Sequence, residues 1–179
     1  MNPESFGEDI AFPKITSELK QMADIDKDVR DRRQTEGYWD EKIDAQHTER
    51  MKQIVADIGW PTKSKVGEQG ESNAWLLVQH ADHDPDFQTY CLGLMKESPV
   101  SEVDPTNIAY LEDRLLLEQG RGQHYGTQFT KIDSQLVPSP IEDEANLEAR
   151  RAKMGLGPMQ EQIDMMYGKY PSAGEATGS

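Results

Sequence analysis

Ionisable side chains gather at residues 79–84, where the sequence reads Gln-His-Ala-Asp-His-Asp. His80 follows Leu76 by four residues, so its side chain is predicted to lie on the buried side of a helix that ends here. A buried imidazole needs hydrogen-bond partners for its ring nitrogens. With a carboxylate beside it His80 would serve as a general acid or base, and otherwise it would tie two helices together. The candidate partners are Asp82, Asp113 and Tyr125.

Residues 80–84 are also dense in metal-ligand side chains, and His47 or His124 is a candidate to join them. Side chains spaced i, i+2, i+3 around a helix end converge poorly, and the sequence contains no pair of histidines four residues apart. We therefore predict no metal site. No cofactor is predicted either, because the sequence has no glycine-rich nucleotide-binding motif and no nucleophilic serine between glycines.

A second polar group follows an apolar helix expected from Asn107 to Gly120. This helix carries Asp113 and Arg114. Burying a charged side chain costs free energy, so we expect each to be paired or to serve a function. Residues 122–128 come next and read Gly-Gln-His-Tyr-Gly-Thr-Gln. Their amides and phenol suit the binding of a polar small molecule or a water. The alternative is that these side chains bond backbone groups at a helix end.

Hydrophobic periodicity predicts a mainly α fold of about six helices, with one short β-hairpin near residues 128–141. We expect residues 1–13 to form a flexible arm, 14–168 a single helical domain and 169–179 a disordered tail. Residues 62–72 are rich in Gly, Lys, Ser and Glu and are predicted to form an exposed loop. The first helix, near 15–34, places Asp26 and Arg30 one turn apart beside its apolar stripe.

The composition argues against several classes of partner. The formal net charge is −14, from 33 acidic and 19 basic residues, and no basic patch is present, so nucleic acid and anionic membranes are not expected partners. No secretory signal or long apolar run occurs, which indicates a cytoplasmic protein. Cys91 is the only cysteine and is predicted to be an inert core thiol.

The motifs together resemble a bacterial domain family of unknown function. They are GWP at 59–61, QHAD at 79–82, AYLEDR at 109–114 and GQHYGTQ at 122–128, and the resemblance covers about residues 15–167. It breaks at Lys27, where the family usually has glutamine. The resemblance implies no established activity. The residues that it singles out are Asp26, Arg30, Gln79, His80, Asp82, Asp113, Arg114, Gln123, Tyr125 and Gln128.

These residues favour an enzyme that carries out hydrolysis or group transfer on a small polar or anionic molecule. The predicted catalytic residues are His80, Asp82 and Tyr125, since they can move or orient protons. The predicted substrate-binding residues are Arg30, Gln79, Asp113, Arg114, Gln123 and Gln128. The alternative is a non-catalytic helical module that binds a ligand or protein and whose polar motifs form a buried structural network. The sequence does not identify a protein partner.

Overall fold

The computed structural model describes residues 10–37, 40–133 and 135–169. Within them lie seven α-helices, one short 3₁₀ helix and two paired strands, which confirms the predicted mainly α fold with one hairpin. The chain divides into two compact units, residues 1–104 and 105–179, and each is described by itself. Most of the predicted N-terminal arm and all but the first residue of the predicted tail lie outside the described residues.

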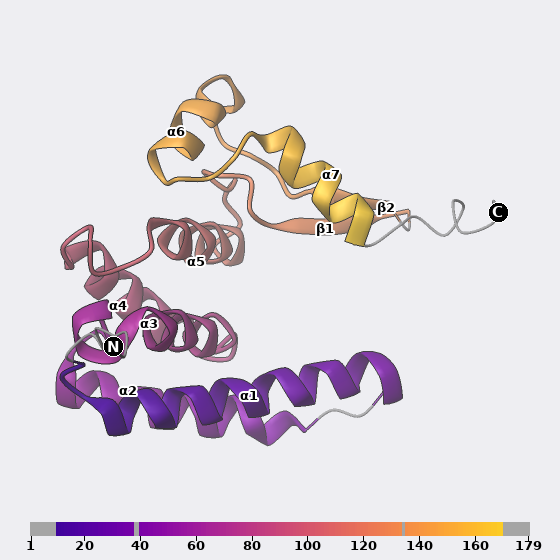
Figure 1. Cartoon of the computed structure of the whole chain (residues 1–179). Coiled ribbons are helices and arrows are strands. Elements are labelled where there is room, and N and C mark those ends of the chain that lie inside the picture. The colour runs from indigo at the N-terminus through magenta and orange to yellow at the C-terminus, as the bar shows by residue number, and fades with distance from the viewer. Residues whose placement is uncertain (1–9, 38–39, 134, 170–179) are drawn as a thin grey trace, which may run out of the picture. The chain divides into compact units, whose positions relative to one another are not determined.

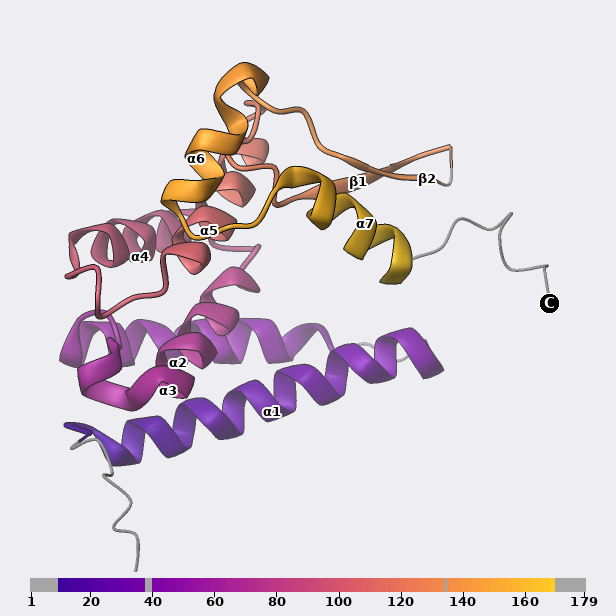
Figure 2. The same cartoon turned by 45° about the horizontal axis from the view of Figure 1, so that its top comes forward.

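The first unit contains four helices (Figure 1). They are α1 (Pro13–Glu36), α2 (Glu41–Ile58), α3 (Lys63–Gln79) and α4 (Pro85–Glu97). Helix α3 packs against each of the other three, and α1 also packs against α2 (Figure 2). Apolar side chains from all four helices form the core, among them Leu19, Met51, Ile54, Val66, Leu77 and Met95, which are at most 2% exposed.

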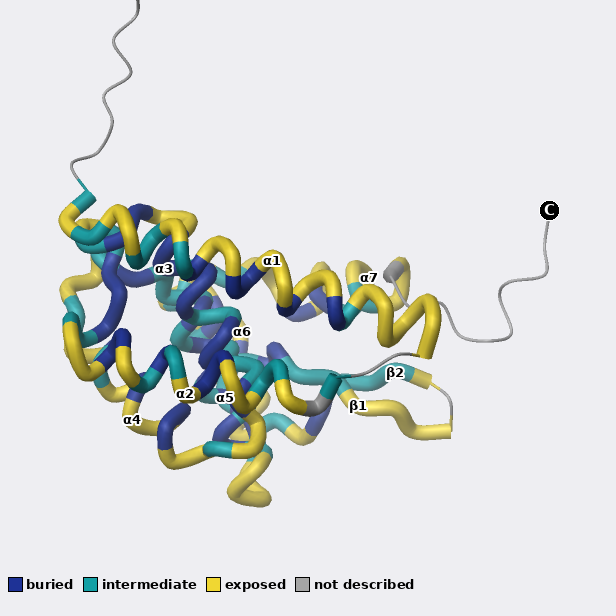
Figure 3. The backbone as a smooth tube through the Cα atoms, turned by 90° about the horizontal axis from the view of Figure 1, so that it is seen from below, coloured by how far each residue is buried: buried dark blue, intermediate teal, exposed yellow. Residues whose placement is uncertain are grey.

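Helix α1 has a proline in its first turn and ends at Gly37, whose φ of 69° is the left-handed conformation that favours glycine. Its buried positions recur at helical spacing along one side (Figure 3). Leu19, Met22 and Val29 follow that spacing, and Asp26 occupies the position between Met22 and Val29. The helix therefore carries a carboxylate into the core of the first unit.

The prediction of an exposed loop at residues 62–72 is wrong, because α3 already begins at Lys63. The helix bends at Gly67, where φ is 76°, and then continues to Gln79. Val66 is fully buried, and its carbonyl accepts a hydrogen bond of 3.0 Å from the Thr16 hydroxyl of α1. Burial against α1 thus stabilises a helix in a segment whose polar, glycine-rich composition disfavours one.

The start of α4 follows from its local sequence, and the prediction that Cys91 lies in the core is confirmed. Asp84 caps α4 by accepting a 3.0 Å hydrogen bond from the Phe87 N–H, ahead of Pro85 in the first turn. Cys91 is fully buried in α4, and burial raises the pKa of its thiol to about 12. Such a thiol stays protonated and unreactive at neutral pH.

The second unit begins with α5 (Pro105–Glu118) and continues with the hairpin of β1 (Phe129–Ile132) and β2 (Gln135–Pro138). The strands are antiparallel, with Phe129 opposite Pro138 and Ile132 opposite Gln135. The 3₁₀ helix Glu144–Asn146 leads into α6 (Leu147–Lys153), and α7 (Met159–Lys169) packs against β2. Among the helices that the structure describes, none is both long enough and apolar enough to cross a membrane.

Candidate functional site

His80 lies immediately after the last residue of α3, and its backbone N–H bonds the Leu76 carbonyl. The helix end therefore fixes where the imidazole leaves the backbone. Its Nδ1 atom lies 3.0 and 2.9 Å from the two carboxylate oxygens of Asp26 on α1. The His80 side chain is 20% exposed, whereas that of Asp26 is only 3% exposed. A buried carboxylate thus supports a histidine that still reaches the surface.

The Asp26 carboxylate also accepts from Arg30, one helical turn later, with both oxygens 3.2 Å from Arg30 Nε. Burial alone would raise the pKa of Asp26, because a carboxylate loses its hydration in the core. The hydrogen bonds and positive charges of His80 and Arg30 outweigh that effect and hold the pKa below its ordinary value. Asp26 is therefore ionised at neutral pH.

The position of the His80 proton follows from these distances. An unprotonated Nδ1 would place a lone pair within 3.0 Å of two carboxylate oxygens, which is repulsive, so Nδ1–H donates to Asp26. The Arg30 Nε–H also lies 2.9 Å from Nδ1, but it has the same two oxygens as stronger acceptors. Nε2 hydrogen-bonds none of the residues that the structure describes. In the neutral ring, Nε2 is then the basic nitrogen.

Helix α2 adds two residues to this group. Asp44 accepts a 2.8 Å hydrogen bond from Arg30 Nη2, so the guanidinium bridges carboxylates on α1 and α2. His47 follows one turn later and is 8% exposed. We call these five residues the His80 cluster: Asp26, Arg30, Asp44, His47 and His80. Over the described ranges, no set of three or more His, Cys, Asp or Glu side chains has the geometry to hold a metal ion.

In the second unit Asp113 is fully buried on α5 and accepts hydrogen bonds from the segment that follows the helix. Its oxygens lie 2.7 Å from the His124 nitrogen, 3.0 Å from the Tyr125 nitrogen, and 3.0 and 2.9 Å from the nitrogen and hydroxyl of Thr127. One carboxylate therefore accepts from three backbone N–H groups of a four-residue segment, which it holds in place against the end of α5.

Gln123 is also fully buried, and within the part of the chain that the structure describes its side chain bonds backbone atoms. Its amide donates to the carbonyls of Gln128 and Ser139, at 3.0 and 2.8 Å, and its oxygen accepts from the Gln128 nitrogen. Arg150 and Arg151 donate to the carbonyls of His124 and Tyr125, at 2.8 and 2.6 Å. We call residues 122–128 with Asp113 the Asp113 loop. Its hydrogen bonds match the structural alternative drawn from the sequence.

The other predicted residues of the second unit are Gln128, Tyr125 and Arg114. The Gln128 side-chain amide donates to the Thr127 hydroxyl at 3.0 Å. Tyr125 is half-buried, and burial raises the pKa of its phenol, helped by the negative charges of Glu112 and Asp113. Arg114 is half-buried on α5. These residues belong to the second unit, whereas His80 and Arg30 belong to the first.

Two more predicted residues flank His80. Gln79 ends α3, and its carbonyl accepts a 3.2 Å hydrogen bond from the Gln88 amide, which caps the helix. The Gln79 side-chain oxygen is buried without a hydrogen bond. Asp82 is exposed just beyond the helix. The structure therefore groups Arg30 with His80, while the carboxylate that contacts the imidazole is Asp26.

Sequence reasoning singled out Asp26 but gave it no role with His80. Its spacing from Arg30 beside an apolar stripe was the available signal, and the structure shows that this ion pair is part-buried. Asp44 lies on a helix of ordinary amphipathic pattern, so no sequence feature placed it at this site. His47 was considered beside residues 80–84 only as a metal ligand. Lys27, where the resemblance breaks, is exposed and is not a member of the cluster.

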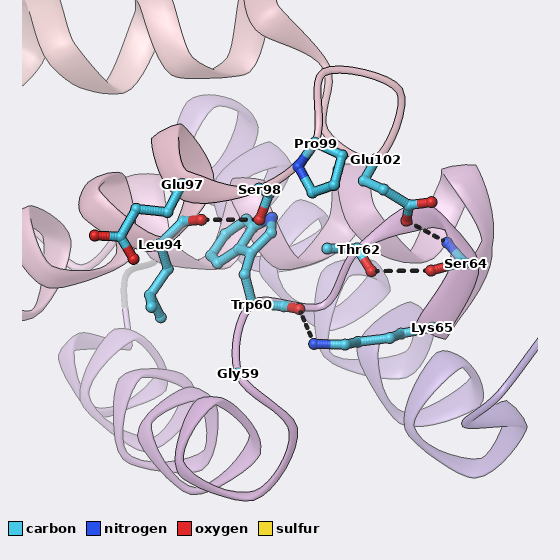
Figure 4. A pocket seen from close by; sticks show the side chains of 10 residues that line it. All are labelled: Gly59, Trp60, Thr62, Ser64, Lys65, Leu94, Glu97, Ser98, Pro99 and Glu102. Carbon is cyan, nitrogen blue, oxygen red and sulfur yellow. Dashed lines mark hydrogen bonds between the residues drawn. The ribbon is translucent and has the colours of Figure 1, made fainter.

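The GWP motif lines a separate pocket of about 510 Å³ in the first unit (Figure 4). Gly59 has a φ of 69° and Pro61 follows, so the motif makes the turn from α2 to α3. Lys65 donates to the carbonyls of Ile58 and Trp60, the latter at 3.1 Å. The carboxylate of Glu102 accepts from the Ser64 N–H at 2.9 Å. These two charges hold the turn in place.

Comparison with known proteins adds a family but no activity. No curated protein and no solved structure matches the chain. One family model matches residues 13–172, which include every described helix of both units. The chain therefore belongs to DUF6624, a family of unknown function.

Proposed function

We propose that this protein is an enzyme that performs acid–base chemistry on a small polar molecule, with His80 as the proton-transfer group. The observation that carries the proposal is the contact of 2.9 Å between His80 Nδ1 and the buried Asp26 carboxylate. This contact fixes the tautomer and leaves Nε2, on a partly exposed ring, as a base.

The proposed chemistry is hydrolysis or group transfer. His80 Nε2 removes a proton from a water or hydroxyl as it attacks the substrate, and the resulting imidazolium then gives the proton to the leaving group. Asp26 is a positioning residue, which holds the ring and stabilises the imidazolium charge. The catalytic roles of Asp82 and Tyr125, and the substrate contacts of Gln79, Arg114 and Gln128, remain predictions, as does a cytoplasmic location.

The test is a conversion assay on a mixture of small amides, esters, phosphomonoesters and nucleosides, followed by proton NMR. We expect the wild-type protein to convert at least one compound, and His80→Gln to lower that rate at least about 100-fold, the usual contribution of a histidine acid or base. His83→Gln is the matched control, because His83 is an exposed histidine three residues away. Equal rates for His80→Gln and wild type would refute the proposal.

A non-catalytic binding module is the second candidate. It is favoured by the Asp113 loop, whose buried carboxylate and Gln123 amide are fully engaged with backbone atoms. If the protein is such a module, neither the wild type nor His80→Gln will convert any compound, and the substitution will alter only stability or binding. The same assay therefore separates the two candidates.

A further inference from the structure

His47 is a buried polar side chain that the proposed chemistry does not use. It lies on α2, one turn after Asp44, and is 8% exposed. Its Nδ1 atom is buried and has no hydrogen-bond partner. Its other ring nitrogen likewise bonds none of the residues within the described ranges. Buried polar atoms are nearly always paired, so an imidazole of this kind needs an explanation beyond packing.

The charged and titratable groups that face His47 come from three elements. Asp26 and Arg30 lie on α1, Asp44 lies on α2 and His80 ends α3. Burial lowers the pKa of His47 most; the two carboxylates raise it, and Arg30 and His80 lower it further. The net effect is a pKa below the ordinary value, so His47 is neutral at pH 7 and has both a donor and an acceptor nitrogen.

The charges of the His80 cluster do not favour an anion. The Arg30 guanidinium lies 3.2 Å from Asp26 and 2.8 Å from Asp44, so two carboxylates share one positive charge. In the unprotonated form that the proposed function requires of His80, and with His47 neutral, the five side chains sum to one negative charge. An anionic group placed against the rings would meet this negative field, whereas an amine, amide or hydroxyl would not.

We propose that His47 is a second ligand-binding residue of the His80 cluster, and that the group bound between the two imidazoles is uncharged or positively charged. This inference rests on the proposed function for the site, and it replaces the anionic substrate expected from the sequence by an amide, alcohol or amine. His47 hydrogen-bonds that group, while His80 Nε2 carries the proton.

The first test compares melting temperatures of the wild type, His47→Phe and His47→Leu. Because the ring nitrogens of His47 make no hydrogen bond to the residues that the structure describes, an apolar side chain of similar size loses no such bond and avoids burying a polar ring. We expect at least one variant to melt within about 2 °C of wild type or above it, a range that corresponds to a small stability change in a chain of this size. A fall of more than about 4 °C in both variants would make His47 a structural residue and overturn the inference.

The second test follows the ring signals of the four histidines by NMR at constant pH and ionic strength, while acetamide, methylammonium, acetate or inorganic phosphate is added. We expect acetamide or methylammonium to shift the signals of His47 and His80 together, with exposed His83 as the internal control. In the better folded His47 variant the shift at His80 should fall several-fold.

Three results would overturn the inference. The first is that acetate or phosphate shifts the two rings more than the other probes do. The second is that none of the four probes shifts His47. The third is that His80 responds equally in the His47 variant. The third result leaves the proposed role of His80 intact, because it shows ligand binding at that ring without His47. Failure of the proposed function appears instead as unchanged conversion by His80→Gln.

Discussion

Asp26 and Asp113 are both buried aspartates on helices, yet their partners differ in kind. Asp113 accepts from backbone N–H groups of its own unit, and its oxygens are enclosed by the segment that they organise. Asp26 accepts from the side chains of an arginine and a histidine, and that histidine is 20% exposed. A carboxylate bonded to backbone fixes a fold. One bonded to a partly exposed imidazole also sets the chemistry of a surface group.

The largest loss of stability is expected for Asp113, because backbone N–H groups depend on its carboxylate. Asp113→Ala removes the acceptor of three buried or part-buried backbone N–H groups, at His124, Tyr125 and Thr127. Each orphaned group costs about 1–3 kcal/mol, so the free energy of unfolding should fall by at least about 3 kcal/mol. The corresponding fall in melting temperature is about 6–12 °C.

Calorimetry measures this change, with Asp133→Asn as the control. Asp133 is an exposed aspartate of the same unit, and its φ of 49° is tolerated by asparagine. If Asp113→Ala melted as the control does, the Asp113 loop would have another means of support, and the contrast between the two aspartates would be lost.

A smaller effect is expected for Asp26→Asn, about 2 kcal/mol at pH 7, since it weakens charge-assisted hydrogen bonds from His80 and Arg30. The effect should depend on pH. The folded-state pKa of Asp26 is lowered, so its stabilisation is present above the ordinary value of about 3.9 and is lost as the pH falls through the lower folded value. Urea unfolding from pH 6 to 2.5 should therefore show a flatter acid loss in Asp26→Asn than in wild type.

Asp28→Asn is the control for this series, because Asp28 is exposed on the same helix. It should follow the wild-type curve throughout. Parallel acid curves for Asp26→Asn and wild type would mean that the Asp26 carboxylate has no special stabilisation in the folded state.

His47 should give the wild-type protein a further dependence on pH nearer neutrality. Its folded-state pKa is lowered by burial, so the unfolded chain takes up the proton first as the pH falls below about 6.5. Stability should decline from that pH down to the lower folded pKa, by at most about 1.4 kcal/mol per pH unit. His47→Phe should remove this slope between pH 7 and 5, as measured by urea unfolding. An unchanged slope would assign it to another group.

The smallest effect on stability is expected for His80→Gln, less than about 1 kcal/mol. The glutamine amide can replace the donor to Asp26, and the His80 side chain is already partly exposed. Thermal unfolding should place this variant close to wild type and well above Asp113→Ala. If His80→Gln lost as much free energy of unfolding as Asp113→Ala, His80 would be a structural residue like Asp113 and not a functional one.

Sequence pattern was sufficient for most of the helices and for the hairpin, because apolar periodicity and proline caps are local features. It failed at residues 62–72, where burial of Val66 against α1 stabilises a helix that composition disfavours. The same limit applies to the site. Asp26 and His80 are 54 positions apart, and only packing of α3 on α1 brings them to 2.9 Å.

The sequence left the role of Gln123 open for the same reason, since its partners are distant along the chain. Its residue type is equally suited to a ligand and to backbone carbonyls, and spacing alone cannot distinguish the two. The carbonyl of Ser139 that it bonds belongs to the chain after the hairpin, 16 positions away. Once the hairpin forms, that partner is supplied by the fold.

The measurement that tests the account most directly is the tautomer of His80, read from long-range proton–nitrogen NMR correlations of the labelled imidazole in the neutral state. We predict a proton on Nδ1, donated to Asp26, with Nε2 as the basic nitrogen. A proton on Nε2 would contradict this, because Nδ1 would then accept from Arg30 Nε, 2.9 Å away. His80 would in that case be a structural member of an ion-pair network and not a base.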